Sequence, residues 1–172
     1  SPPVNFSSPD FFHMTNPTGG KNRLLIVDDE PTNIHILSNI LSGDYEIRAA
    51  NNGQRAIEAA KSQAPDLILL DMIMPGLDGL QVCKLLQEDE ATKDIPVIFV
   101  TSMSDPANEE LGLRAGAVDY ISKPVSPPIV KARVKIHLQN RLTVRFLEGL
   151  LSSQTTTLED AKNQAQSLLV FV

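Results

Sequence analysis

The sequence predicts an α/β protein, a doubly wound parallel sheet of five strands flanked by five helices. Short, fully apolar runs recur along the chain, and amphipathic stretches of about 10 to 15 residues separate them. Continuous rather than alternating hydrophobicity means that both faces of each strand are covered, as in a parallel sheet between two helical layers. The chain has 172 residues, 42% of them hydrophobic, which suits one domain with a real core and additional segments at its ends.

Five strands are expected in order along the chain. Three strong apolar runs, residues 24–27, 67–70 and 97–100, are too short for buried helices. Two weaker runs, residues 45–49 and 118–122, have the length and composition of edge strands. Strands that alternate with helices in this way predict right-handed crossovers.

The helices are expected between these strands, where apolar residues recur at helical spacing. These residues are Ile34, Leu37, Ile40 and Leu41, then Ala56, Ile57 and Ala60, then Leu80, Val82, Cys83 and Leu86. Pro31 stands where a first helical turn tolerates proline, and Gly76, Gly79 and Gly116 fall in the connections.

The two ends of the chain differ from the middle. Residues 1–20 are rich in proline and have no period, which predicts a flexible tail, and His13-Met14 resembles a cloning junction. Residues 21–143 form the predicted domain, and residues 144–172 a helical extension or linker toward an output domain further on. The chain ends on five apolar residues, which is the reason to expect that domain.

A long fifth helix is expected to start at Pro127-Pro128 and to run to Gly149. Its apolar residues mostly follow at four-residue steps that drift round the helix and make no clean heptad: Ile129, Val130, Val134, Leu138, Leu142, Phe146 and Leu150. Residues 152–157 are expected to interrupt it, and a capping box at 156–159 to start a second helix. A homodimer through this C-terminal helix is one expectation.

Composition excludes several functions. Lys and Arg number 15 against 21 Asp and Glu, a net charge of −6, which argues against nucleic-acid binding. No apolar run approaches the roughly 18 to 20 residues that span a bilayer, so no membrane association is expected. A single cysteine, Cys83, predicts a reducing cytoplasm and core packing. The histidines are too widely spaced for a zinc site, and His35 and His137 are expected on helix surfaces.

Polar residues follow four of the predicted strands. Asp28 and Asp29 follow the first strand, Asp71 the third, Thr101 the fourth and Lys123 the fifth. Ligands of doubly wound sheets bind beyond the carboxyl ends of the strands, so these groups should converge on one small site.

Three carboxylates that meet need a positive partner, because each pair at about 4 Å costs roughly 4 kcal/mol at an effective dielectric of 20. Mg²⁺ is suited to this role, since it takes one or two carboxylates, keeps several waters and works beside phosphate. Lys123 and Thr101 then suit a phosphoryl group, and Asp71 becomes the nucleophile that receives it.

Residues 21–141 resemble the receiver domain of two-component response regulators, of which CheY is the minimal form. Five blocks in order carry the resemblance: IVDDE at 26–30, LDMIMPGLDG at 70–79, VTS at 100–102, GAVDY at 116–120 and KP at 123–124. The resemblance implies the CheY-like, or flavodoxin-like, strand order 2-1-3-4-5 and a phosphorylation-dependent switch. No enzyme with an external substrate is implied for this chain.

The family pattern implies the roles of the acids. Asp71 accepts the phosphoryl group from a phosphohistidine, supplied by a sensor histidine kinase or a phosphotransfer protein. Asp29, Asp71 and the backbone carbonyl of Ile73 hold Mg²⁺ or Mn²⁺, and Asp28 acts through a bound water.

The family pattern also implies the groups that follow the phosphoryl group. Thr101 hydrogen-bonds it, Lys123 pairs with it, and a cis peptide before Pro124 aims the lysine. Tyr120 is the switch aromatic, expected to turn inward when Thr101 moves.

Two other classes of protein are alternatives to a receiver domain. A haloacid-dehalogenase type phosphatase also phosphorylates an aspartate with Mg²⁺, but it needs an acid where Ile73 stands. A flavodoxin-like FMN carrier needs a phosphate loop after the first strand, where residues 28–31 would repel phosphate. Ile73 and Met103 flank the path of an attacking water and cannot orient it, so self-dephosphorylation is expected to be slow.

Overall fold

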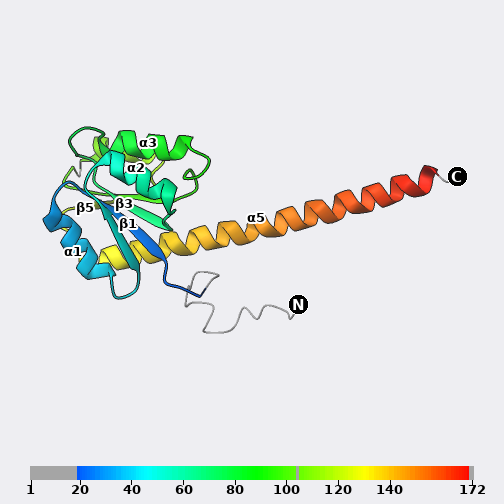
Figure 1. The fold of residues 1–172 in the computed structure, drawn as a ribbon, viewed down its shortest axis with the longest axis horizontal. Helices are drawn as coiled ribbons and strands as arrows, with labels where there is room; N and C mark the ends of the chain where they lie inside the picture. Colours follow the sequence, from blue (N-terminus) through cyan, green and yellow to red (C-terminus); the bar gives the residue numbers. More distant parts are fainter. Residues whose placement is uncertain (1–18, 104, 171–172) are drawn as a thin grey trace. The chain divides into compact units, whose positions relative to one another are not determined.

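The computed structural model describes residues 19–103 and 105–170 (Figure 1). The expectation for the tail therefore lies almost wholly outside the described residues. The chain divides into two compact units, Ser1–Leu138 and Gln139–Val172, which are described separately.

The first unit contains one parallel five-stranded sheet. Its strands are β1 (Arg23–Val27), β2 (Glu46–Ala50), β3 (Leu67–Leu70), β4 (Val97–Thr101) and β5 (Asp119–Ser122). They pair in the order β2-β1-β3-β4-β5, which confirms the predicted topology. Both edge strands begin one residue later than the sequence suggests, a shift within the usual uncertainty of strand ends.

Five helices alternate with the strands, as predicted: α1 (Pro31–Leu41), α2 (Gly53–Ser62), α3 (Gly79–Glu88), α4 (Pro106–Arg114) and α5 (Pro127–Val170). Side chains fix three of the starts, because a free helix N-terminus leaves backbone N–H groups without partners. Asn52 and Asp105 each accept a backbone N–H three residues on, and Asp78 forms a capping box with Gln81.

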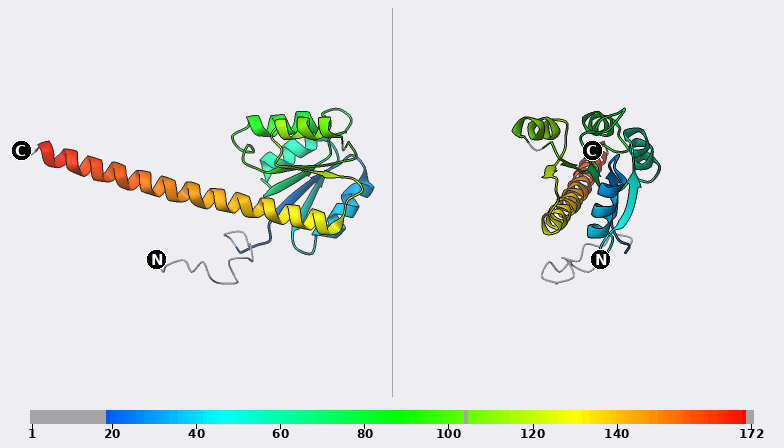
Figure 2. Two further views of the ribbon diagram at one scale, coloured as in Figure 1. Left: turned by 180° about the vertical axis from the view of Figure 1, so that it is seen from behind. Right: turned by 90° about the vertical axis from the view of Figure 1, so that its left-hand side faces the viewer.

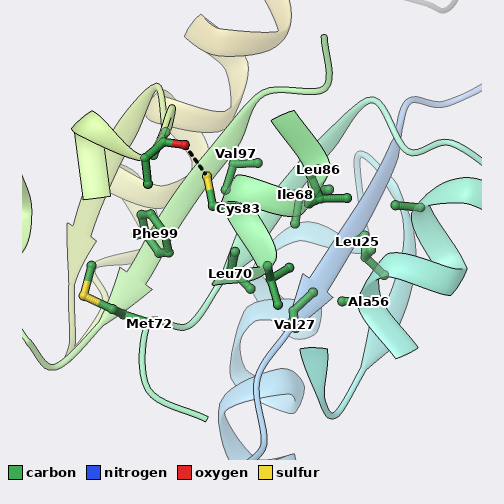
Figure 3. Packing of buried hydrophobic residues seen from close by; sticks show 14 of the residues in the cluster. Leu25, Val27, Ala56, Ile68, Leu70, Met72, Cys83, Leu86, Val97 and Phe99 are labelled. Carbon is green, nitrogen blue, oxygen red and sulfur yellow. Dashed lines mark hydrogen bonds between the residues drawn. The ribbon is translucent and has the colours of Figure 1, made fainter. Parts of the chain in front are cut away.

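Apolar residues fill both faces of the sheet. On one face, β-strand side chains pack with α2 and α3 (Figure 3), and Gly112 of α4 lies against Phe99. On the other face, α1 and the first turns of α5 cover the sheet (Figure 2). Val130, Val134 and Leu138 of α5 are buried there. Three of the predicted apolar runs form the strands between these layers, β1, β3 and β4, and each is buried on both sides.

Cys83 belongs to the first of these clusters, as predicted. Its side chain is fully buried, and its thiol donates a hydrogen bond to the carbonyl of Ala115, 3.4 Å away (Figure 3). Burial raises the pKa of the Cys83 thiol to about 11. The thiol therefore stays protonated and unreactive at neutral pH.

The fifth helix is continuous from Pro127 to Val170, so the expected interruption at residues 152–157 is wrong. The hydroxyls of Thr155, Thr156 and Thr157 each donate to the carbonyl four residues earlier, at 2.9–3.0 Å. Such bonds satisfy the hydroxyl groups within a continuous helix, so these residues need not interrupt it. Among residues 19–103 and 105–170, every helix is too short or too polar to cross a bilayer.

Candidate functional site

Three carboxylates meet at the carboxyl edge of the sheet. Asp28 follows β1 and Asp71 follows β3, two strands that pair directly. One oxygen from each of Asp28, Asp29 and Asp71 lies within 4.8 Å of the others. Asp28 and Asp71 are buried, at 2% and 7% exposed, whereas Asp29 faces solvent. The convergence expected from the strand order is present.

Lys123, the residue directly after β5, contacts two of these carboxylates. Its Nζ donates to Asp28 Oδ2 at 2.6 Å and to Asp71 Oδ2 at 3.2 Å. The Lys123–Pro124 peptide bond is cis, the isomer that the family resemblance implied. Burial alone would lower the pKa of the Lys123 ammonium, but the hydrogen bond to Asp28 and the charges of Asp71 and Asp28 raise it above its usual value. The lysine therefore carries a fixed positive charge.

Backbone N–H groups orient the two buried carboxylates. Glu30 N–H donates to Asp28 Oδ1 at 2.9 Å, and Ile73 N–H donates to Asp71 Oδ1 at 3.3 Å. The amide of Asn33, on the first turn of α1, also donates to Asp28, at 3.4 Å. Asn33 is not among the site residues predicted from the sequence. A polar side chain in the first turn of a helix that begins just after an acidic pair is the signal that could have found it.

Gly79 has a positional role that the sequence analysis also missed. A Cβ atom at this position would lie 2.2 Å from the backbone carbonyl oxygen of Asp71. Only glycine lets the start of α3 approach the backbone of the nucleophile candidate this closely. The signal in the sequence that could have found this role is the spacing, because Asp71 and Gly79 lie at the two ends of the short segment 71–79.

Thr101 and Tyr120 come from adjacent strands. Thr101 is fully buried as the last residue of β4, not the first residue after it, and its Oγ1 accepts a hydrogen bond from Met103 N–H at 3.3 Å. Tyr120, on β5, is 8% exposed, and its ring lies 6.4 Å from that of Phe99.

The hydroxyl of Tyr120 is buried and has no hydrogen-bond partner among the described residues. Burial raises the pKa of this hydroxyl, and the negative charges of Asp105, Glu109 and Asp71 add to the effect. Burying a hydroxyl without a hydrogen-bond partner costs free energy, and a different rotamer of Tyr120 that gives the hydroxyl a partner would remove this cost.

The residues at the edge suit a hard divalent cation. The donors that meet here are the carboxylate oxygens of Asp28, Asp29 and Asp71, and carboxylate oxygens are ligands that Mg²⁺ prefers. Lys123 alone balances only one of the three negative charges. The side chains of Ile73 and Met103 are apolar and are 51% and 37% exposed.

A second charged cluster has a different composition. Asp119, at the start of β5, contacts Arg133 Nη1 at 2.5 Å and His137 Nε2 at 2.8 Å. The side chain of His137 is only 16% exposed, so the expected helix-surface position is wrong for this histidine. His35 is exposed, as expected. Burial opposes ionisation of Asp119, but the hydrogen bonds from His137 and Tyr120 N–H and the charge of Arg133 lower the pKa of its carboxyl.

The sheet order and the acid-lysine edge define a protein of the CheY-like class. The response regulator receiver domain family matches residues 24–135, which is well over half of the chain. The chain belongs to this family. It is a receiver domain followed by a helical segment.

Relatives agree with this assignment. A Vibrio cholerae protein named "Probable cyclic di-GMP phosphodiesterase" is 44% identical over 138 residues, 80% of this chain and 31% of its own length. The response regulator PleD of Caulobacter vibrioides is 37% identical over 123 residues, 71% of this chain and 27% of its own length. The chain thus spans about a third or less of these relatives.

Solved structures agree as well. The BeF3-activated N-terminal receiver domain of RstA from Klebsiella pneumoniae is 33% identical, with a TM-score of 0.64. The match covers 68% of this chain and 98% of that one. The phosphatase and flavoprotein alternatives find no support in the comparisons.

Proposed function

We propose that Asp71 is the residue that receives the phosphoryl group in this receiver domain. The observation that carries the proposal is the pair of contacts from Lys123 Nζ, 2.6 Å to Asp28 and 3.2 Å to Asp71, at an edge where three carboxylates meet. A carboxylate held next to a fixed cation and a candidate metal site is equipped both to attack phosphorus and to tolerate the charge that follows.

The donor we propose is a phosphohistidine of a sensor histidine kinase or of a phosphotransfer protein. A carboxylate oxygen of Asp71 attacks the phosphorus, the P–N bond to the donor breaks, and the imidazole leaves with the bonding electrons and takes up a proton. Of the histidines among the described residues, His35 is exposed and His137 contacts Asp119, so we assign the donor histidine to another protein.

Mg²⁺ or Mn²⁺ is the proposed cofactor. Asp29, Asp71 and the backbone carbonyl of Ile73 would hold the ion directly, and Asp28 would act through a water. When bound, the ion neutralises carboxylate charge and that of the incoming phosphoryl oxygens. The ammonium of Lys123 remains as the protein's own cation on the phosphoryl group.

The proposed switch uses Thr101 and Tyr120. Phosphorylation replaces a group of charge −1 by one near −2 with three acceptor oxygens. The hydroxyl of Thr101, which accepts a bond from Met103 N–H, can donate to one of these oxygens. Tyr120 lies beside β4, its hydroxyl has no partner among residues 19–103 and 105–170, and its inward position is the one that the switch would stabilise.

The output of the switch is proposed to lie beyond these residues. We propose that residues 21–143 act as the receiver and that residues 144–172 lead to an output domain, with no external substrate turned over by this chain. The Vibrio cholerae relative, whose name includes a cyclic di-GMP phosphodiesterase, is consistent with an enzymatic output elsewhere in a longer protein. A cytoplasmic location, no direct contact with nucleic acid or membrane, and a homodimer through the C-terminal helix complete the proposal.

The test uses a small phosphodonor with Mg²⁺. We expect one phosphoryl group per chain, in an adduct that is stable in acid and labile in base, and no adduct in Asp71→Asn. An Asp119→Asn variant is the matched control, because it removes a half-buried carboxylate outside the acid-lysine edge and should label normally. Continuous turnover of the donor, or equal labelling of the Asp71→Asn variant, would contradict the proposal.

A further inference from the structure

The second half of α5 carries a repeat that the first half lacks. From Val144 on, apolar residues return at alternating steps of three and four residues, with one polar member. This seam consists of Val144, Leu147, Leu151, Gln154, Leu158, Ala161, Ala165 and Leu168. A repeat of three and four sustained over more than three heptads is the pattern of a coiled-coil seam.

The seam is open to solvent in a single chain. Every described residue from Thr143 to Leu169 is exposed, including all eight seam positions. Leu151 is 64% exposed, and Leu158 and Leu168 are each 72% exposed. The four-residue steps noted in the sequence belong to a different face, where Val130, Val134 and Leu138 are buried against the sheet. The heptad therefore begins after that buried face has ended.

The helix itself indicates that something covers the seam. Residues 152–157 are all serine, glutamine or threonine, and Gly149 lies three residues before this stretch. These are weak helix formers apart from the glutamine, and isolated helices draw little stability from propensity alone. A continuous helix through this stretch needs packing along its apolar face.

We infer that the seam pairs with the same seam of a second copy of this chain, as a parallel, in-register, two-stranded coiled coil. This inference rests on the homodimer proposed above and specifies its residues and orientation. It does not depend on phosphoryl transfer.

The charges of the segment favour a second copy as the occupant. Residues 139–172 contain three basic and three acidic residues, so two copies do not repel through net charge, whereas the chain as a whole carries −6. The positions flanking the seam oppose no like charges in a parallel pair: Leu150 faces Thr155 of the other copy, and Thr157 faces Lys162.

Gln154 sets the orientation. In a parallel, in-register pair it lies opposite its own copy, and the two amides can hydrogen-bond to each other. In an antiparallel pair it lies opposite a leucine position, which leaves a polar amide without a partner. A single polar residue within an apolar seam specifies register in this way at some cost in stability.

The experiment measures the mass of the full 172-residue chain by sedimentation equilibrium. We expect twice the chain mass of 18.8 kDa. Leu151→Glu with Leu158→Glu should raise the dimer dissociation constant by at least about a hundredfold, since four buried leucines become charged. Phe146→Glu with Ser153→Glu is the matched control, because both positions point away from the seam, and its mass should not change.

Cross-linking tests the orientation. Leu147→Cys alone and Leu168→Cys alone should each form a disulfide-linked dimer on oxidation, because the native Cys83 is buried and does not compete. A monomer, a larger oligomer, a dimer that survives the seam substitutions, or disulfides that form only when the two cysteine variants are mixed would overturn the inference. Labelling of Asp71 by the small phosphodonor in the same variants shows that the receiver is folded. Failure of the dimer proposal can therefore be distinguished from failure of the proposal that Asp71 is phosphorylated.

Discussion

The two units of this chain differ in how far their apolar residues are buried. The first unit encloses them in two clusters, one on each face of the sheet. The second unit leaves them in solvent, with no buried residue described between Thr143 and Leu169. Both contain amphipathic helix, so amphipathicity alone does not show where the partner surface is. In the first unit the sheet supplies that surface, and in the second we infer that another chain does.

The largest expected effect concerns the core of the first unit. Phe99→Ala should lower the free energy of unfolding by about 3–5 kcal/mol, because Phe99 is fully buried between the sheet and α4. Phe146→Ala, at a residue that is 49% exposed, should cost less than about 0.5 kcal/mol. Urea unfolding of the two variants measures both values. Similar losses would remove the contrast between the units.

Glycine should behave differently in the two units as well. Gly79→Ala should destabilise the receiver by about 1–3 kcal/mol and slow phosphorylation, because its Cβ would press on the backbone of Asp71. Gly149→Ala is the matched control, since no atom lies within 4 Å of its Cβ position, and it should raise helix stability by about 0.5–1 kcal/mol. Urea unfolding and the labelling rate report the outcome. A neutral Gly79→Ala would show that the close approach has no cost.

The exposed apolar residues of the two units should also differ in role. In the helix we infer that they form the seam, whereas in the receiver Ile73 and Met103 are exposed, and we propose that they deny an attacking water a polar partner. Ile73→Asn with Met103→Glu should shorten the phosphorylated lifetime by about tenfold or more, because polar groups can orient the water. Loss of the label after removal of the donor gives the lifetime. A lifetime no shorter than that of the parent protein would count against the prediction.

The smallest effect concerns the ion pairs that join α5 to the sheet. Asp119→Asn should cost about 0.5–1 kcal/mol at neutral pH, because the contacts are partly exposed. The folded-state pKa of Asp119 is lowered, so its contribution is present above the usual carboxyl pKa near 4 and is lost as pH falls through the lower folded value. Urea unfolding at several pH values should show the two proteins converging in acid. A constant difference would contradict this assignment.

Much of the fold follows from the sequence because its signals are local and strong. The runs at 24–27, 67–70 and 97–100 are apolar on every residue, which only a strand covered on both faces requires. The site follows from the same step, since parallel strands carry Asp28, Asp71 and Lys123 to one edge.

What sequence reasoning missed depends on details of packing. The contact between His137 and Asp119 requires knowing which face of α5 meets β5, and the apolar pattern there drifts. The tight approach of Gly79 to Asp71 depends on the path of the connecting loop. The break was expected at residues 152–157 because threonine can cap the start of a new helix. The threonine hydroxyls instead donate hydrogen bonds to carbonyls four residues earlier, within one continuous helix.

The most direct test of the central claim is to locate the phosphoryl group on the chain. After reaction with a small phosphodonor, the acyl phosphate can be reduced with borohydride and the modified residue identified by mass spectrometry of peptides. We predict one modified residue, Asp71, and modification that requires Mg²⁺ or Mn²⁺. Modification at Asp28, Asp29 or another residue in place of Asp71, or full labelling without a divalent cation, would contradict it.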